Sequence, residues 1–532
     1  MRIVTVQEMS RADQRALHEW QLPTLMMMEN AGLGVARCLL REAEPAPGAR
    51  VLVLAGKGNN GGDALAAARH LAMAGLRVQA ILLAARQRLK PDPGLMLSLA
   101  ERCGVEVLEC PEAASWPGFR PLIGEADLII DGILGTGLKK PISGWLAEVV
   151  ASINASPAPA FSIDIPSGLS GDRPEVPGPC VQADVTIALG LPKPALVLPP
   201  AEALAGELHV AGLGVPIEEL LDSPSQLDLL EASTIRHLLP GRPPDAHKGS
   251  FGHVLALVGS RGKPGAGGLV CLAALRAGAG LVTAAVPRSA HPIVASFRPE
   301  VMVEPLAETD SGSLAWKGID RLRELVRDKT LILAGPGLGT DPDTVQVLRA
   351  LISETRLPLV LDADALNAFC GRSERLDGRG RALILTPHPG EMARLTGISS
   401  ADVQSRRLEA ARGLAAARSC HLVLKGYRSL IAAPDGHVDI NPTGSSALAT
   451  AGTGDVLSGL VAGYLAQGLA PADALRCAVY LHGLAGDIAS AELGEMPVVA
   501  SDVIDYLPRA LRAVLHPSQD ADSPPRRRSP RS

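Results

Sequence analysis

The sequence contains no long apolar run. A membrane-spanning helix needs about 20 consecutive apolar residues, and no run reaches that length here. The N-terminal segment MRIVTVQEMSRADQRAL also lacks the apolar core of a secretory signal peptide. We therefore expect a cytoplasmic protein that does not contact membranes.

The sequence also lacks paired cysteines. Its eight cysteines lie far apart, and none belongs to a C-x-x-C motif, the spacing that marks many zinc and redox sites. Isolated cysteines of this kind are typical of buried thiols in a reducing compartment.

An excess of positive charge is absent as well. The net charge is −5, so the composition does not favour a nucleic-acid partner. Four arginines do cluster near the C-terminus, in a low-complexity segment over 516–532. We expect that segment to be a disordered, solvated tail.

What the sequence does contain is a regular alternation of short apolar runs with helical patterns. That alternation is typical of parallel sheets covered by helices on both faces. The first series of predicted strands covers 51–55, 77–83, 105–109, 127–131, 160–164 and 184–189. The second covers 253–259, 281–286, 331–335, 359–364, 382–386, 421–426 and 429–434, and is followed by helices near 455–468, 471–490 and 500–515.

The two series predict two α/β domains. A stretch rich in proline, aspartate and serine separates them and is interpreted as a linker over 216–246. We therefore expect a Rossmann-like three-layer α/β/α domain over 1–215 and a second α/β/α domain over 247–515. Residues 10–13 read as a capping box that opens the first helix.

A glycine-rich turn follows the first predicted strand. Gly56, Gly58 and Gly61 satisfy the dinucleotide-binding pattern G-x-G-x-x-G. That fold also needs an acidic residue at the end of the next strand, but RVQAILLAAR has none, which disfavours an ordinary NAD-dependent dehydrogenase. The turn would instead offer N–H groups to an anion and the Asn60 side-chain oxygen to a monovalent cation. The alternative is a plain turn with Asp63 as the helix N-cap.

Two further predicted strands end in aspartate. Asp131 precedes the segment GILGTGLKK, and Asp164 precedes IPSG. Ligands bind at the carboxyl ends of parallel strands, so we expect Asn60, Asp63, Asp131, Asp164 and Ser167 to converge on one crevice. The alternative is that each aspartate only caps a turn.

At this point a family resemblance is visible. The segments MSRADQRAL, LPTLMMMENAG, AGKGNNGGDA, DGILGTGL and IDIPSGLSGD resemble the NAD(P)H-hydrate epimerases, the YjeF N-terminal family, over about residues 1–215. The resemblance implies a potassium ion at Asn60, Asp131 and Ser167, and Asp164 is our candidate acid/base. It implies substrate contacts at Asn59, Asn60, Gly61, Gly62, Asp63, Gly135, Thr136, Gly137, Leu138, Lys139, Lys140, Pro141 and Asp164. The family usually has glycine where this chain has Ala64, whose methyl group either crowds the substrate or is harmless.

The second series carries ATAGTGDVLSG at the start of a predicted helix. Free N–H groups there can hold a phosphate, and Asp455 is placed to act as a base beside it; the alternative is an ordinary N-cap. The P-loop pattern is absent, which excludes a P-loop nucleotidase. His388 lies in a proline-braced turn after a strand, as a ligand or as a structural residue.

Five segments together resemble a second family. HKGSFGHVL, GPGLGTD, LDADALN, TPHPGEM and AGTGDVLSG are similar to the ribokinase-like, ADP/ATP-dependent NAD(P)H-hydrate dehydratases over about residues 230–515. The resemblance implies hydrate contacts at Ala266, Gly337, His388 and Asp455, with ADP as co-substrate and Mg²⁺ as its metal. It implies nucleotide contacts at Lys425, Gly426, Tyr427, Arg428, Ser429 and Gly454. The family often has KGAGT where this chain has KGYRS, and it also differs at NPTGSSALATAG.

Together the two resemblances imply a bifunctional repair enzyme for hydrated NADH and NADPH. The first domain would interconvert the R and S hydrates, and the second would dehydrate the S form at the expense of ADP. We also expect a homo-oligomer without a nucleic-acid partner. Two alternatives remain open, namely a ribokinase-like small-molecule kinase fused to a nucleotide-binding module, and a first domain that only binds because Ala64 marks a degraded site.

Overall fold

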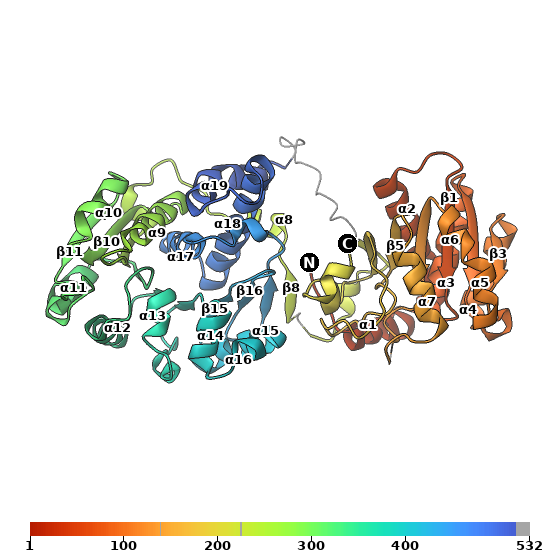
Figure 1. Cartoon of the computed structure of the whole chain (residues 1–532), viewed down its shortest axis with the longest axis horizontal. Coiled ribbons are helices and arrows are strands. Elements are labelled where there is room, and N and C mark those ends of the chain that lie inside the picture. Colours follow the sequence, from red (N-terminus) through yellow and green to blue (C-terminus); the bar gives the residue numbers. More distant parts are fainter. Residues whose placement is uncertain (139, 224–225, 518–532) are drawn as a thin grey trace. The chain divides into compact units, whose positions relative to one another are not determined.

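The computed structural model describes residues 1–138, 140–223 and 226–517 (Figure 1). The chain divides into two compact units. The N-terminal unit is Arg2–Ser225, and the C-terminal unit is Gln226–Ser532 together with Met1. Lys139 and most of the predicted tail lie outside the described residues.

The N-terminal unit is built on a parallel sheet. Within the described residues its order is β3-β2-β1-β4-β5-β6-β7, and every neighbouring pair is parallel. The strands are β1 (Arg50–Ala55), β2 (Arg77–Leu82), β3 (Glu106–Glu109), β4 (Leu128–Gly132), β5 (Ala160–Ile163), β6 (Val185–Leu189) and β7 (Glu207–Ala211). The first six coincide with predicted strands, and β7 was not predicted because its ELHVA pattern is half polar and half-exposed.

Alternating residues of β1 show why helices cover both faces of this sheet. Val51, Val53 and Ala55 belong to a buried cluster with α2 and α3, whereas Leu52 and Leu54 belong to a second cluster with α7. Successive side chains of a strand point to opposite faces, so the arrangement is three-layered, as predicted. The helices are α1 (Val6–His18), α2 (Thr24–Ala43), α3 (Asn59–Met73), α4 (Pro91–Arg102), α5 (Trp116–Phe119), α6 (Pro121–Glu125) and α7 (Trp145–Asn154).

Two predicted helix starts are wrong. The capping box of α1 is formed by Thr5 and Glu8, not by residues 10–13. Helix α3 begins at Asn59 after the N-cap Gly58, so Asp63 lies inside the helix and the N-cap interpretation of this aspartate fails. The early start is possible because the first turn packs closely: a Cβ atom on Gly61 would lie 1.8 Å from the Gly56 carbonyl oxygen.

The C-terminal unit contains a longer sheet. Its order within the described residues is β11-β10-β9-β12-β13-β14-β15-β16-β17-β8, and only β16 runs antiparallel to its neighbours. The strands are β8 (Leu227–Leu229), β9 (His253–Leu257), β10 (Leu281–Pro287), β11 (Met302–Leu306), β12 (Leu331–Ala334), β13 (Leu359–Leu361), β14 (Leu383–Leu385), β15 (His421–Leu424), β16 (Leu430–Ala432) and β17 (Val438–Ile440). β8 and α8 lie within the predicted linker 216–246, so part of that stretch belongs to the folded unit.

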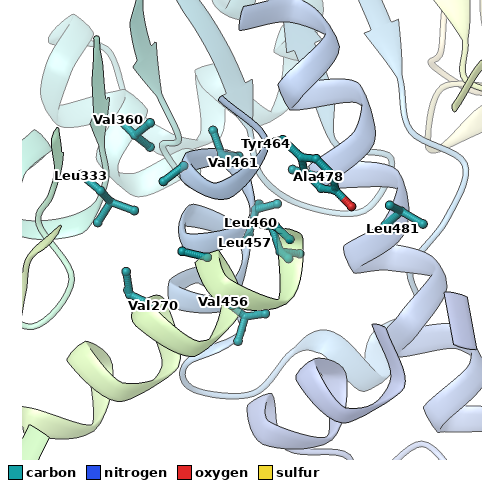
Figure 2. Packing of buried hydrophobic residues seen from close by; sticks show 14 of the residues in the cluster. Val270, Leu333, Val360, Val456, Leu457, Leu460, Val461, Tyr464, Ala478 and Leu481 are labelled. Carbon is teal, nitrogen blue, oxygen red and sulfur yellow. The ribbon is translucent and has the colours of Figure 1, made fainter. Parts of the chain in front are cut away.

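Helices α9, α17, α18 and α19 form the apolar core on one face of this sheet. Figure 2 shows Val456, Leu460 and Tyr464 of α17 beside Val270 of α9 and residues of α18. The helices are α8 (Ala232–Leu238), α9 (Pro264–Ala277), α10 (His291–Phe297), α11 (Ile319–Val326), α12 (Pro342–Glu354), α13 (Ala363–Asn367), α14 (Pro389–Thr396), α15 (Ser400–Ser405), α16 (Arg407–Arg418), α17 (Thr453–Ala466), α18 (Pro471–Leu493) and α19 (Ala500–Leu515). No helix in the described ranges is both long and apolar enough to cross a bilayer.

Candidate active sites

The carboxyl ends of β4 and β5 meet through a buried aspartate. Asp131, at the end of β4, is fully buried, and its Oδ2 accepts hydrogen bonds from Ser162 Oγ at 2.9 Å and from Ser167 N at 2.8 Å. Its Oδ1 accepts from Ser167 Oγ at 2.5 Å and from Ile133 N at 3.2 Å. Burial raises the pKa of Asp131, and these hydrogen bonds oppose the rise. Asp131 and Ser167, which were predicted to lie in one crevice, are therefore in direct contact.

Asn60 lies beside this network, in the first turn of α3. Its side chain is buried, and Nδ2 has no hydrogen-bond partner among the described residues. A Cβ atom on Gly135 would lie 3.5 Å from Asn60 Oδ1, so the loop after β4 passes over the amide. Asn60 Oδ1 likewise accepts no hydrogen bond among the described residues, so the amide oxygen is free to act as a cation ligand. The hard oxygen donors of Asn60, Asp131 and Ser167 thus fit the potassium ion that the resemblance implies.

Asp164 follows β5 and has an unusual backbone. Its φ is 63°, in the left-handed region, which turns its carboxyl group away from the path of the strand. Oδ1 accepts from Lys193 Nζ at 2.5 Å and from Leu189 N at 3.4 Å. Oδ2 accepts no hydrogen bond from the part of the chain that the structure describes, so it remains available to a substrate.

The remaining predicted contacts of this unit lie in the loop after β4. Gly135, Thr136, Leu138 and Lys140 are half-buried or exposed, and Lys139 falls outside the described residues. Thr136 Cγ2 would lie 3.5 Å from a Cβ atom on Gly171, so the loop runs alongside the segment that follows Asp164. The structure therefore brings this loop, Asn60 and Asp164 to one edge of the sheet.

Ala64 does not line this crevice. Its side chain is fully buried in the apolar cluster between α3 and the sheet, and its Cβ would lie 2.4 Å from a Cβ atom on Gly132 of β4. The alanine methyl group thus occupies room that the glycine on the strand leaves free. This position favours the alternative in which the methyl group of Ala64 is harmless, and its effect on substrate binding stays a prediction.

In the C-terminal unit, Asp455 occupies the first turn of α17. The N-cap of this helix is Gly452, in the left-handed conformation at φ 90°, and the first turn of the helix exposes backbone N–H groups. Burial, followed by the charge of Asp362, raises the pKa of Asp455 to about 6, while Lys425 opposes the rise. A carboxyl group with this pKa can accept a proton near neutral pH more readily than an ordinary aspartate.

Lys425, after β15, links several groups around this turn. Its Nζ donates to Asp362 Oδ1 at 2.8 Å and lies 3.8 Å from Glu391 Oε2. Asp362 Oδ2 accepts from Ser458 Oγ of α17 at 2.5 Å, and Asp362 is almost fully buried. A Cβ atom on Gly454 would lie 3.5 Å from Lys425 Nζ. An ammonium group and a helix N-terminus therefore adjoin Asp455, as a phosphate site requires.

Besides Asp455, three residues are predicted to contact the hydrate, namely Ala266, Gly337 and His388. Ala266, at the start of α9, approaches Gly337, because Ala266 Cβ would lie 2.9 Å from a Cβ atom on Gly337. His388 caps α14: its Nδ1 accepts from Gly390 N at 3.0 Å, while its side chain stays half exposed. His388 therefore has a structural role as the N-cap of α14, and its predicted contact with the hydrate stays a prediction.

The predicted nucleotide loop, 425–429, connects the antiparallel strands β15 and β16. Gly426 has a φ of 139°, and a Cβ atom there would lie 2.7 Å from Arg407. Tyr427 is exposed, and the Arg428 guanidinium lies 5.5 Å from the centre of its ring. The loop thus presents a flat aromatic surface next to Lys425.

Comparison with known proteins places both units in one family. The chain is 42 % identical over 513 residues to the bifunctional NAD(P)H-hydrate repair enzyme of Moorella thermoacetica, covering 96 % of this chain and 97 % of the relative. This chain belongs to the bifunctional NAD(P)H-hydrate repair enzymes. The repair enzyme of Thermofilum pendens is 38 % identical over 519 residues, with 97 % of each chain covered. The predicted family resemblance is confirmed.

The two halves of this repair enzyme match separate family models. The model described as YjeF-related protein N-terminus matches residues 24–195, and the model described as NAD(P)H-hydrate dehydratase matches residues 254–509. Among solved structures, the ADP/ATP-dependent NAD(P)H-hydrate dehydratase of Bacillus subtilis, co-crystallised with ATP and Mg²⁺, is 32 % identical. It covers 54 % of this chain and 98 % of its own, with a TM-score of 0.47.

Sequence reasoning missed several residues of this repair enzyme that contact the predicted ones. Lys193 was the most accessible to prediction, since it is the only charged residue between Val185 and Ala201, and a lone lysine in an apolar segment needs a partner. Asp362 lies in the segment LDADALN, where the sequence alone does not distinguish it from Asp364. Ser458 carries no signal, since a serine inside a helix is ordinary.

Proposed function

We propose that the N-terminal unit interconverts the R and S hydrates of NADH and NADPH, and that the C-terminal unit dehydrates the S hydrate with ADP, releasing AMP and phosphate. The observation that carries the proposal is the position of Asp455, a carboxyl group with a raised pKa between a helix N-terminus and the Lys425 ammonium. The test is recovery of the near-ultraviolet absorbance of NADPH from its hydrate with ADP added.

The dehydration needs a better leaving group than hydroxide. The C6 hydroxyl oxygen attacks the terminal phosphorus of ADP, the bond to AMP breaks, and Asp455 takes the hydroxyl proton. The ring nitrogen then expels phosphate from C6, and loss of a proton from C5 restores the double bond. Both carboxylate oxygens of Asp455 are open to the hydrate, because neither accepts a hydrogen bond within the described ranges.

Charge on the transferring phosphoryl group is met by two features of the chain. The N–H groups at the start of α17 point toward an anion bound at Gly454, and the Lys425 ammonium adjoins the same turn. Asp362 holds that ammonium in place, and Ser458 holds Asp362. A Mg²⁺ ion would arrive on the phosphates and take at most one or two carboxylate ligands, for which Asp364, whose charge acts on Asp455, is the candidate.

The epimerisation serves the dehydratase by converting the R hydrate into the form that it consumes. C6 carries both a hydroxyl group and the ring nitrogen, so the configuration inverts when the hydroxyl leaves as water and water returns on the opposite face. Asp164 Oδ2 accepts a proton from the water that returns. The predicted loop over 135–141 and the N–H groups at the start of α3 would bind the phosphates of the substrate.

Potassium would be held by Asn60, Asp131 and Ser167, and its charge would help to neutralise the substrate phosphates. We predict that Asn60→Ala lowers the ratio of the R-to-S rates in potassium and sodium buffers toward one. The matched control is Asn154→Ala, which removes an amide already bonded to Cys180 O and Gln182 N. An unchanged potassium response in Asn60→Ala would exclude this residue as a ligand.

The two activities are expected to separate when the chain is cut between residues 225 and 226. A fragment over 226–532 retains β8, which pairs with β17, and should dehydrate the S hydrate at the rate of the full chain. It should consume the R hydrate only as fast as that epimer converts spontaneously. A matched fragment that starts at 232 lacks β8 and should melt at a lower temperature. Equal catalysed consumption of both hydrates by the first fragment would contradict the division of labour.

The compartment and the assembly belong to the same proposal. All eight cysteines are free thiols, and six are buried, which agrees with a reducing cytoplasm. A homo-oligomer stays a prediction, to be checked by light scattering. The alternative of a kinase fused to an unrelated module is disfavoured, since the similarity to the repair enzymes extends over both units.

A further inference from the structure

Lys193 is a buried lysine at the predicted epimerase site. It lies between β6 and a short 3₁₀ helix, Pro194–Leu196, and its side chain is 2 % exposed. Its Nζ donates to Asp164 Oδ1 at 2.5 Å and to Leu189 O at 3.2 Å. Burying an ion pair gains little stability, because the desolvation of both charges offsets their attraction. The pair therefore calls for a functional explanation.

Two more carboxyl groups interact with this ion pair. Asp13 of α1 has a buried Oδ1 without a hydrogen-bond partner in the described part of the chain. Burial raises the pKa of Asp13 to about 6, Lys193 opposes the rise and Asp164 adds to it. Asp63 of α3 is buried as well, and burial, then Asp164 and Asp13, raise its pKa well above the usual range.

The Lys193 ammonium thus contacts Asp164 and acts on the charge of Asp13, whereas Asp63 is buried without a cation paired to it in the described part of the chain. Asp131, at the end of β4, is a further carboxyl group at this sheet edge, and its oxygens accept hydrogen bonds from Ser162, Ser167 and Ile133. Only Asp164 contacts the ammonium directly. Burial without a paired cation favours the protonated form of a carboxyl group, so Asp63 is the member of this group that retains a proton, while the ammonium stabilises the carboxylate of Asp164.

We propose that Lys193 is a positioning residue of the epimerase: its ammonium holds Asp164 as the carboxylate that accepts a proton, while Asp63 keeps the proton that the departing hydroxyl group needs. The inference rests on the proposed function of this unit. In this arrangement, two carboxyl groups in different environments serve as the acid and the base of one reaction. The same division of roles recurs in enzymes with paired carboxyl groups.

The chemistry balances without a nucleotide or an oxidant. Asp63 protonates the C6 hydroxyl group, the C6–O bond breaks, and the lone pair of the ring nitrogen forms a C=N bond as water leaves. Water then adds to the opposite face of C6 and gives a proton to Asp164. Transfer of that proton from Asp164 back to Asp63 restores the starting state.

The test uses the full chain and measures R-to-S conversion against pH. Lys193→Met should lower kcat at least tenfold at pH 7, with a smaller change in KM, and should move the acid limb of the pH profile to higher pH, because the ammonium that favours the carboxylate is lost. Lys193→Arg should restore the position of the limb at least in part. Lys90→Met, at an exposed lysine of the same unit, is the matched control and should match the wild type.

A second variant tests the proton donor and does not depend on the folding of Lys193→Met. The charge of Asp13 helps to raise the pKa of Asp63, so Asp13→Asn should lower that pKa and move the alkaline limb to lower pH. An unshifted alkaline limb would overturn the assignment of Asp63. A Lys193→Met profile that is lowered equally at every pH would overturn the role of Lys193, because a merely structural lysine would act in that way.

An infrared measurement separates this inference from the proposed function. With ¹³C-labelled aspartate, Lys193→Met should show additional protonated carboxyl absorption at pH 7 relative to the wild type, whether or not the unit is an epimerase. An unchanged spectrum would overturn the inference. Absence of catalysed R-to-S conversion in the wild type would instead overturn the proposed function, even with the expected spectrum.

Discussion

Asp455→Asn should lower ADP-dependent dehydration of the S hydrate by about 10²–10⁴, the usual contribution of a general base. Asparagine has nearly the same shape but cannot accept the hydroxyl proton, and Lys425 and Asp362 keep their ion pair. The measurement is the single-turnover rate of NADPH recovery with S hydrate and ADP. Binding of ADP should change little, since the N–H groups of α17 and Lys425 remain.

The same substitution should change stability in a pH-dependent way. The pKa of Asp455 rises from 3.8 to about 6 on folding, so between these values the folded state binds more protons and loses stability as pH rises. At about 1.4 kcal/mol per pH unit, the cost above pH 6 is up to ~3 kcal/mol. Asp455→Asn removes this cost and should melt at a higher temperature than the wild type at pH 8, with the difference vanishing near pH 4.

The matched control is Asp473→Asn, which changes an aspartate in the first turn of the next helix, α18. Asp473 pairs with Arg476, which keeps its second partner Asp439 when Asp473 is changed, so the substitution should leave dehydration unchanged. If Asp455→Asn dehydrates at a rate close to that of this control, Asp455 is an ordinary first-turn residue and the base lies elsewhere.

The second large effect is expected from Asp164→Asn, which should reduce R-to-S conversion by about 10²–10⁴ while S dehydration stays unchanged. Asparagine is the better probe than alanine because Asp164 has a φ of 63°. Asparagine tolerates the left-handed region, whereas alanine there costs about 1–2 kcal/mol. The assay follows R hydrate alone with excess fragment 226–532 to consume the S product.

A surface aspartate of the same sheet provides the control. Asp127 precedes β4 and pairs with Arg50, so Asp127→Asn should leave the conversion rate unchanged. If Asp164→Asn loses stability yet keeps its rate in the folded fraction, the residue only shapes the turn after β5, and the acid/base assignment is wrong.

The fold was largely predictable because buried parallel strands leave a plain pattern. Runs such as VLVLA and LILAG are apolar on both faces and end at a glycine or just before one, so their existence and order follow from the sequence. The strands β7, β8, β11 and β17 were missed since they are short, partly polar or lie near a sheet edge. Their pairing depends on neighbours distant in the sequence.

The candidate sites were predictable only in part, and for a different reason. Motifs near the ends of strands identified Asp131, Asp164 and Asp455, because parallel topology places the carboxyl ends of the strands at one edge of the sheet. Parallel topology gave no means to see that the charge of Asp13, on the first helix, acts on Asp63. The motifs also could not show which way the Ala64 side chain points, because a shift of one residue along a helix turns a side chain by about 100°.

The pairing of β8 with β17 also bears on how the chain is made. The register joins Leu227 to Val438, so β17 must leave the ribosome before β8 can enter the sheet. Arg2–Ser225, by contrast, is a compact unit in itself and can fold while the rest is still being translated. A nascent chain that stalls before residue 438 would carry a finished first half and an unpaired strand, the kind of exposed edge that recruits chaperones or other chains.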